Sequence, residues 1–479
     1  MTKRDMLPKP TGLSNEFLYL EWKNVRKMSW QLFPDAVNVK KTINNMDSLS
    51  FKKLIQDSDI ETICDAQFTG DGYSTRVDIL QRLKLEDNSW HLFGVKSGSR
   101  YKAKYIRDIA FSVMVLTKSG INVHKTTILY LSNDYRLGMD ASKLFTKIDC
   151  TEKVELKMQE FLALSNKAFK DIESKNMPEP CIKTNCKNCP TFDICIGKGI
   201  KNHIFDLPRL SKLATEKLIA LGVHTIDKIP DDFEFTQMQT VAKNCVLTNT
   251  PYVSDNLKIA LANIEQPFYY LDFESVTTVM PLYPEIAPHT QLLTQFSLDK
   301  ADSFGNILDH YEYIADQTKD CRREIAEKLI KYLGESGSII TYANAESIAI
   351  LKLADLFSDL SEKLDKIAER IVDLELIIRK NYYDINFHGR TSIKKVLPVL
   401  ISELSYANLK IDKGGDASAA FAFMAMGLYD EKKVEETKRN LLKYCAQDTL
   451  AMVHIHQFLI NIANNNTNND TTIVEENYK

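Results

Sequence analysis

The sequence predicts a mixed α/β protein built from more than one domain. Its 479 residues exceed the length of an ordinary single domain and suit two or three. Short apolar stretches typical of strands alternate with longer stretches of helical periodicity in both halves of the chain. A composition of 44% hydrophobic and 26% charged residues is ordinary for a globular protein and provides apolar material for substantial cores.

The first half carries the pattern of an α/β domain. We expect strands at residues 77–80, 91–95 and 127–131, which are short and rich in β-branched and other apolar side chains. We expect helices at 105–118 and 152–173, where the apolar residues recur at helical spacing. The second of these helices leads into a group of cysteines.

Residues 203–266 are expected to be helical throughout. The stretch LSKLATEKLIALGVHTIDKIP places a turn at Gly222 between two apolar runs, which is similar to a helix-hairpin-helix element. We favour the simpler interpretation, a small helical connector between two larger domains.

The second half opens with a strand in FYYLDFES, residues 268–275, and a second strand is expected at 337–342. From Leu353 to Ile378, apolar residues recur at spacings of four and three, which predicts a helical stripe that serves as core or as a helix hairpin. The polar, asparagine-rich residues 461–479 predict a disordered tail.

The sequence gives no sign of a membrane protein. It contains no run of about 18 apolar residues, so no membrane span is expected. The N-terminal stretch MTKRDMLPKP lacks the apolar core of a signal peptide, which predicts a cytoplasmic location.

Local basic clusters are better indicators of a nucleic-acid partner than the net charge of −3. One lies in the first half, with no acid among its members, and another lies between Arg379 and Lys395. Both patterns are typical of phosphate contacts and equally of a solvated basic face. The cluster of the first half consists of Lys96, Arg100, Lys102, Lys104 and Arg107.

Two carboxylates stand on the first strand of the second half. Asp272 and Glu274 are two residues apart, so their side chains leave the same face of the strand. Their neighbours in the strand are apolar, and paired carboxylates in apolar surroundings favour a divalent cation. The alternative is an exposed edge strand whose acids are solvated.

Further acids favour the metal site. Glu346 follows the second strand at an expected helix start, and Asp373 stands in IVDL. In YCAQDT, Tyr444 and Asp448 are four residues apart and therefore share one face of a helix. A strand with D-x-E, an acid after a second strand and a late Y-x-x-x-D resemble the DEDD exonucleases of RNase H-like fold, in their tyrosine variant.

The resemblance implies roles for these residues. Asp272, Glu274, Glu346 and Asp448 would hold two Mg²⁺ or Mn²⁺ ions, and Tyr444 would position the attacking water. Two metal ions about 4 Å apart suit phosphodiester hydrolysis, because they activate a water and stabilise the leaving oxygen. The family usually has Asp where this chain has Glu346. Lys394 and Lys395, in TSIKKVLP, are expected beside the substrate backbone or, alternatively, at the start of a surface helix.

Four of the nine cysteines crowd into fifteen residues in the pattern C-x4-C-x2-C-x5-C. Four thiolates so close suit an iron–sulfur cluster or Zn²⁺. A 4Fe–4S cluster is the first expectation, and Zn²⁺ is the alternative. The remaining cysteines are expected to be plain buried residues. The cluster consists of Cys181, Cys186, Cys189 and Cys195.

The first half resembles the RecB-type PD-(D/E)XK nucleases, including the CRISPR-associated members with a cysteine-bound iron–sulfur cluster. Asp65 in CDAQF, Asp78 in RVDIL and Lys96 in FGVKSGS follow in the family's order. The family has a metal-binding acid two positions before the lysine, where this chain has Gly94. Without that ligand a divalent ion has too few hard donors, so we expect a degenerate nuclease site that binds nucleic acid or serves as a scaffold.

Together these parts resemble an uncharacterised bacterial family that fuses a RecB-type nuclease domain, a four-cysteine cluster and a DEDD-type domain. LYLSNDYRLG, YYLDFES, TSIKKVLPVL and YCAQDTLAMV carry the resemblance. The expected organisation is a degenerate PD-(D/E)XK nuclease-like domain with the cysteine cluster at 13–200, a helical connector at 201–266, an RNase H-like DEDD exonuclease domain at 267–460, and a tail at 461–479.

The resulting functional hypothesis is an enzyme. We expect a metal-dependent 3′-to-5′ exonuclease that acts on single-stranded DNA or RNA through its second half. The alternatives are a catalytically inactive nucleic-acid-binding protein and a subunit of a repair or defence complex. The acids at 272, 274, 346 and 448 favour the enzyme, whereas Gly94 and the unusual Glu346 favour the inactive protein.

Overall fold

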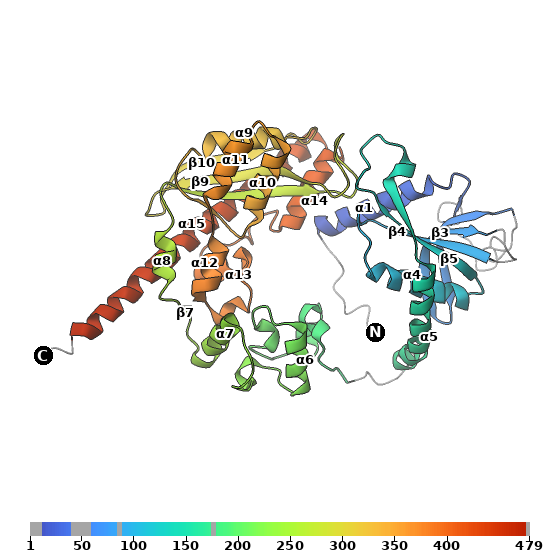
Figure 1. Ribbon diagram of the computed structural model, residues 1–479, viewed down its shortest axis with the longest axis horizontal. Helices are drawn as coiled ribbons and strands as arrows, with labels where there is room; N and C mark the ends of the chain where they lie inside the picture. The colour runs from blue at the N-terminus through green and yellow to red at the C-terminus, as the bar shows by residue number, and fades with distance from the viewer. Residues whose placement is uncertain (1–11, 40–58, 84–88, 174–178, 476–479) are drawn as a thin grey trace. The chain divides into compact units, whose positions relative to one another are not determined.

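The structure, a computed structural model, describes residues 12–39, 59–83, 89–173 and 179–475. The chain divides into two compact units. The N-terminal unit comprises Leu13–Pro178 together with Thr277–Gln291, and the C-terminal unit comprises Glu179–Val276 and Leu292–Lys479. Both units combine sheets with helices, which confirms the α/β class (Figure 1).

The N-terminal unit is built on a sheet of six strands that lie in chain order. The first two strands are parallel, as are the fourth and fifth, and the other neighbours are antiparallel. The three predicted strands are confirmed within β3, β4 and β5. The strands are β1 (Val37–Asn38), β2 (Thr62–Gly70), β3 (Tyr73–Arg82), β4 (Ser89–Lys96), β5 (Asn122–Leu131) and β6 (Phe145–Asp149).

Helices bury both faces of this sheet. Val25 packs with Ile79 and other residues of one face, whereas Ile109 packs with Leu80 on the opposite face. Because successive strand residues point to opposite faces, two covered faces require nearly continuous apolar strands, as the sequence has them. The helices are α1 (Leu13–Trp30), the 3₁₀ turn η2 (Ala141–Leu144), and the two predicted ones, α4 (Lys104–Lys118) and α5 (Thr151–Glu173).

The C-terminal unit contains a five-stranded sheet in the order β10-β9-β8-β11-β12. The predicted acid-bearing strand is β8, and it lies at the centre of this sheet. β11 runs parallel to β8 and β12, while β9 and β10 are antiparallel to each other. The bounds are β8 (Phe268–Thr277), β9 (Gln291–Ala301), β10 (Ile307–Ile314), β11 (Ile339–Thr341) and β12 (Ile371–Asp373).

Two groups of helices enclose the central sheet. Leu271 of β8 packs with Ile325 of α9 and Ile350 of α10 on one face, and Tyr270 packs on the other face. The first group is α9 (Arg322–Tyr332), α10 (Ala345–Leu356) and α11 (Ser361–Glu369). The second group is α12 (Leu374–Asn381), α13 (Ile393–Leu400) and α15 (Glu431–Glu475), with α14 (Gly414–Ala425) beside α15 (Figure 1).

The expectation that 203–266 is helical throughout is wrong in detail. Short helices alternate there with 3₁₀ turns, and β7 pairs with β13 in a two-stranded sheet. Leu218 and Ile226 of this connector share one core with Ile377 and Leu397, so it is part of the C-terminal unit. Its elements are η5 (Ile204–Asp206), α6 (Lys212–Ala220), η6 (Ile226–Lys228), α7 (Gln237–Thr248), β7 (Tyr252–Val253) and α8 (Leu257–Ala262), and β13 is Tyr382–Tyr383.

The stripe at 353–378 is not one helix. It spans the end of α10, all of α11, strand β12 and part of α12. The short helices α11 and α12 both turn their apolar residues to the sheet. The spacing of three and four therefore continues across the end of one element and the start of the next, and periodicity alone cannot locate that boundary.

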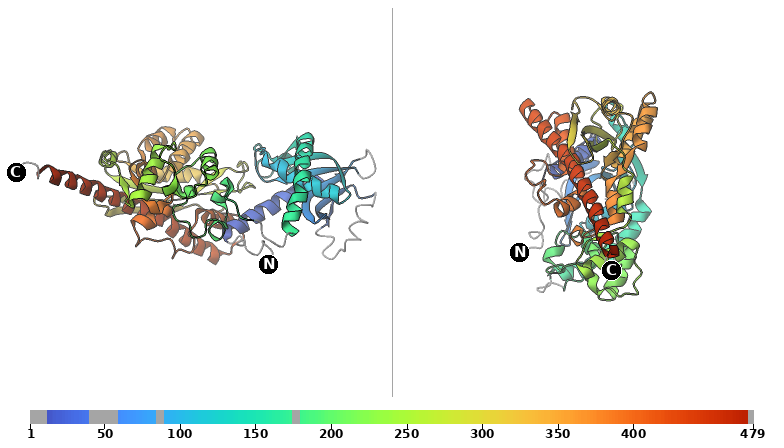
Figure 2. Two further views of the ribbon diagram at one scale, coloured as in Figure 1. Left: turned by 90° about the horizontal axis from the view of Figure 1, so that it is seen from below. Right: turned by 90° about the vertical axis from the view of Figure 1, so that its left-hand side faces the viewer.

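The predicted disordered tail, 461–479, overlaps the last helix at residues 461–475. These residues continue α15, which ends at Glu475, and Figure 2 shows this helix extending away from the sheet of its unit. Propagating an existing helix by one residue is much less costly than starting one. Residues 476–479 lie outside the described part of the chain. No helix of the described residues is long and apolar enough to cross a membrane.

Candidate functional site

Three carboxylates meet where β8 passes α15. Asp272 and Glu274 alternate with apolar residues of the central strand and therefore point to the face that α15 covers. Asp448 lies on α15, close to Cys445, whose thiol contacts a carboxylate oxygen of Asp272 at 3.3 Å. One oxygen of each of the three acids lies within 4.8 Å of the others, which is a spacing that a metal ion can bridge.

The electrostatics of this group are those of a site that needs a cation. Burial and the neighbouring carboxylates raise the pKa of Asp272 well above its usual range. The same two causes raise the pKa of Glu274 to about 8, and burial raises that of Asp448 to about 6. Three carboxylates cannot all ionise here without compensation, which a divalent cation would supply.

Glu346 lies near this group in the first turn of α10. Its side chain is buried, and burial raises its pKa to about 7, with smaller contributions from Asp373 and Asp448. Its Oε2 atom is buried and has no hydrogen-bond partner among the described residues. Glu346 is not one of the acids whose oxygens lie within 4.8 Å of one another, so its role as a fourth ligand stays a prediction. A buried carboxylate oxygen without a partner fits that role.

Asp373, the acid between the motifs, has a structural role. Its carboxylate caps α12 by accepting a hydrogen bond from the backbone N–H of Leu376, and it also accepts one from Ala343. An Asp in this position satisfies amides that the first helical turn leaves free.

Lys394 and two tyrosines surround the carboxylates. The Lys394 ammonium donates to the phenol oxygen of Tyr444 at 2.8 Å and to the carbonyl oxygen of Asp412 at 2.5 Å. An ammonium group can only donate hydrogen bonds, so the phenol oxygen of Tyr444 accepts this one. The phenol hydrogen of Tyr444 is then free to point elsewhere. Tyr406 donates a short hydrogen bond to Asp448. Tyr406 stands in no recognisable motif, so the sequence did not predict it as a site residue.

These groups open into one cavity of about 330 Å³. Its wall carries both carboxylates of β8, Asp448 and Tyr444, together with Lys394, but not Lys395, which is exposed. Of the two lysines predicted beside a substrate, only Lys394 therefore lies at the carboxylates. The cavity is lined by Asp272, Glu274, Tyr342, Ala343, Glu375, Ser392, Ile393, Lys394, Tyr444, Asp448 and Met452.

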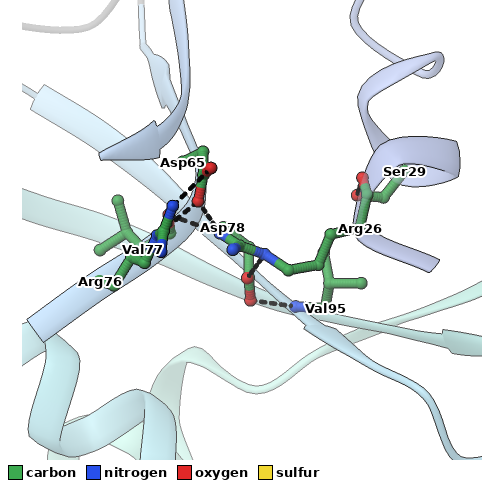
Figure 3. Close-up of polar contacts among 7 residues, drawn as sticks. All are labelled: Arg26, Ser29, Asp65, Arg76, Val77, Asp78 and Val95. Atoms are coloured by element: carbon green, nitrogen blue, oxygen red, sulfur yellow. Dashed lines mark hydrogen bonds and ion pairs between the residues drawn. The ribbon is translucent and has the colours of Figure 1, made fainter. Parts of the chain in front are cut away.

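An arginine lies at the centre of the candidate nuclease site of the N-terminal unit (Figure 3). The guanidinium of Arg26, from α1, lies between the two acids, 2.7 Å from Asp65 and 2.6 Å from Asp78. Arg76 forms a second ion pair with Asp65 at 2.5 Å. The carboxylates to which the resemblance assigns a metal are thus neutralised by arginines of the chain itself.

Gly94 is the other departure from an active site. A Cβ atom on this residue would lie 2.7 Å from the Ile109 side chain of α4, so an acid there would require that side chain to move. Lys96 forms an ion pair with Asp108 at 2.8 Å. Asp65, Asp78 and Lys96 therefore each have a partner within the unit, and the degenerate nuclease site stays a prediction.

The other basic residues of the first cluster surround the start of α4. Arg100, Lys102, Lys104 and Arg107 are exposed there. They are available to a phosphate backbone, and a solvated basic face describes them equally well.

The four clustered cysteines belong to the C-terminal unit, whereas the sequence analysis placed them in the first domain. Cys181 and Cys195 are exposed, and Cys186 and Cys189 are partly buried beside the 3₁₀ turns η3 (Thr184–Asn188) and η4 (Phe192–Ile194). Among the described residues, no three of these sulfurs lie within 4.8 Å of one another. The four sulfurs of a tetrahedral zinc site would lie about 3.8 Å apart, given a Zn–S bond of about 2.3 Å.

The other cysteines are buried, as predicted. None of these five forms a disulfide in the described part of the chain; they are Cys64, Cys150, Cys245, Cys321 and Cys445.

Comparison with known proteins covers part of the chain. Residues 269–392, which include β8 and Glu346, match a family described as "Domain of unknown function (DUF2779)". The chain is 25% identical over 226 residues to "Uncharacterized protein MG366 homolog" of Mycoplasma pneumoniae, an alignment that covers 43% of this chain and 34% of that protein. It is 23% identical over 241 residues to "Uncharacterized protein MG366" of Mycoplasma genitalium, covering 45% and 35%. The chain thus spans about a third of the length of these relatives.

Proposed function

We propose that the protein is a metal-dependent exonuclease that removes nucleotides from the 3′ end of single-stranded DNA or RNA. The observation that carries the proposal is the group of Asp272, Glu274 and Asp448, whose oxygens lie within 4.8 Å of one another at a cavity. The orphaned Oε2 of Glu346 supports the presence of a cation in the same place. The resemblance to the DEDD exonucleases selects phosphodiester hydrolysis among metal-dependent reactions.

The carboxylates would bind metal, the tyrosines would position groups around them, and Lys394 would add positive charge. Asp272, Glu274 and Asp448 would hold Mg²⁺ or Mn²⁺, with Glu346 completing the set. When bound, the two ions would activate the attacking water and stabilise the charge on the leaving oxygen. In the reaction, the water oxygen bonds to phosphorus, the bond from phosphorus to the 3′ oxygen of the penultimate nucleotide breaks, and that oxygen gains a proton.

Tyr444 and Tyr406 position groups around the carboxylates. Because Lys394 donates to Tyr444, the phenol O–H can donate to a water or to a phosphate oxygen in the cavity. Tyr406 holds Asp448 by its hydrogen bond and limits the rotation of that carboxylate. The Lys394 ammonium adds positive charge at the point where a phosphate would lie.

The test is a degradation assay on 3′- and 5′-end-labelled DNA and RNA strands with Mg²⁺, Mn²⁺ or EDTA. We expect stepwise shortening from the 3′ end with either metal and none with EDTA. Binding of single strands without metal-dependent shortening of any DNA or RNA end would replace the enzyme with a nucleic-acid-binding protein. Activity that requires another polypeptide would favour a subunit of a repair or defence complex.

We also propose that the four clustered cysteines hold a 4Fe–4S cluster. The four cysteines fall within fifteen residues, and the resemblance to nucleases with a cysteine-bound iron–sulfur cluster favours this cluster over zinc. Protein purified without oxygen should be brown and contain iron. Colourless protein with one zinc ion per chain would decide for the alternative.

A further inference from the structure

A second cavity adjoins the acidic one. It has a volume of about 590 Å³ and shares two lining residues, Ala343 and Glu375, with the cavity of the carboxylates. Arg209 and Arg379 both contribute to its wall. They come from distant parts of the chain, since Arg209 follows η5 in the connector and Arg379 lies in the last turn of α12.

Neither arginine is paired with an acid. Within the described part of the chain, Arg209 and Arg379 make no ion pair and no side-chain hydrogen bond. By contrast, Arg323 of the same unit pairs with Asp359 at 2.5 Å. An arginine at a cavity wall without a counter-ion is available to an anionic ligand.

The acids of this cavity are already engaged. One oxygen of Asp373 accepts from two backbone amides, those of Ala343 and Leu376. Glu375 accepts a hydrogen bond of 2.5 Å from the Thr391 hydroxyl. In the described part of the chain, both carboxylates accept from neutral donors, and neither forms an ion pair with Arg209 or Arg379.

We propose that this arginine cavity, defined by Arg209 and Arg379, binds a phosphate of a single-stranded nucleic acid next to the one that is cut. The inference rests on the proposed function, because it takes the 3′ end to lie at the carboxylates. A continuous strand must leave the acidic cavity through an adjoining space, and the arginine cavity is such a space. The planar guanidinium matches two phosphate oxygens, and Asn344 and Ser347 add hydrogen-bonding side chains to the same wall.

The chemistry specifies what each arginine contributes. Contacts to the backbone of a strand are independent of base sequence, and each one makes binding more sensitive to salt. The arginines do not touch the scissile phosphate. Their loss should therefore weaken the binding of substrate and transition state equally, which raises KM and leaves kcat unchanged.

The first measurement is the affinity for an oligonucleotide under conditions that prevent cleavage. Full-length Arg209→Ala, Arg379→Ala and the double variant are titrated against a 5′-fluorescein oligothymidylate in EDTA, over a range of salt. We expect each single change to weaken binding about tenfold at low salt and to lower the slope of log K against log salt by about 0.7. Arg439→Ala is the matched control, because Arg439 is exposed on α15 and lines neither cavity.

The second measurement uses a substrate too short to reach the arginine cavity, the p-nitrophenyl ester of thymidine 5′-monophosphate. The arginine variants should hydrolyse it at the wild-type rate while their KM for the oligonucleotide rises. Unchanged oligonucleotide affinity, or an equal loss in Arg439→Ala, would overturn the proposal, as would a wild-type protein that binds no oligonucleotide. Loss of binding in the arginine variants of a protein that hydrolyses neither substrate would preserve this site and refute the exonuclease.

Discussion

At the scale of single residues, the proposed function depends on the carboxylates of the C-terminal unit. We expect Asp272→Ala to lower the exonuclease rate by about 10²–10³-fold or more, because it removes charge stabilisation where charge develops. Tyr444→Phe should be milder than Asp448→Ala, since the phenol positions a ligand whereas the carboxylate holds a metal. Rates on an end-labelled strand measure this order, and circular dichroism should show that each variant is folded. A Tyr444→Phe variant as inactive as Asp448→Ala would contradict it.

The same carboxylates make stability depend on pH when no metal is present. The folded protein keeps a proton on Glu274 up to about pH 8, whereas an unfolded chain releases it near the usual value of 4.5. The folded state then binds more protons, so the free energy of unfolding falls as the pH rises from about 4.5 to about 8. Asp448 and Glu346 act in the same direction, up to about pH 6 and about pH 7.

Thermal unfolding in EDTA across this range measures the effect. We expect Tm to fall as the pH rises, Glu274→Gln to reduce that fall, and Mn²⁺ to raise Tm more at pH 8 than at pH 5. A metal-free Tm that rises from pH 5 to pH 8 would show that the carboxylates are not crowded as described.

At the scale of elements, Arg26 attaches α1 to the sheet of the N-terminal unit. Its side chain is buried and pairs with Asp65 and Asp78, so Arg26→Met would leave two buried acids without their central counter-ion. We expect a loss of about 3–5 kcal/mol in the free energy of unfolding of this unit. Arg76→Met is the matched control, because its side chain is 39% exposed and its loss should cost less. Chemical denaturation compares the two, and equal losses would argue against a central role for Arg26.

At the scale of the whole molecule, the two units are expected to divide binding and catalysis. Lys96→Ala should leave the exonuclease rate nearly unchanged, because Lys96 is paired with Asp108 and the neighbouring acids are neutralised by Arg26. Its effect on strand binding is measured in the same titration as above. If Lys96→Ala or Asp78→Ala abolishes cleavage and Asp272→Ala does not, catalysis belongs to the N-terminal unit.

If the clustered cysteines hold iron as proposed, the metal content should affect the stability of the C-terminal unit. Cys189→Ser should release the bound iron and lower the stability of the connector region, because binding at such sites is coupled to folding. Iron analysis, absorbance and thermal unfolding of the full chain measure both effects. Cys245→Ser, at a buried cysteine outside the cluster, is the control that should retain the iron.

The sequence by itself determined the local part of the candidate site. Asp272 and Glu274 share a face because strand residues alternate, and Tyr444 and Asp448 share a face because helix residues four apart are neighbours. It also determined the α/β class and three of the six strands and two of the helices described in the N-terminal unit, since these depend on local periodicity. The same periodicity failed at 353–378, where the apolar residues of several short elements divide between the two faces of the central sheet.

Only the tertiary structure decided which distant residues meet. Lys394 and Tyr406 reach Tyr444 and Asp448 from other segments, and Arg209 of the connector lines a cavity with Arg379 of α12. It likewise decided that Arg26 lies between Asp65 and Asp78. Spacing along the chain carries no information on such meetings, because the packing of whole elements brings the side chains together.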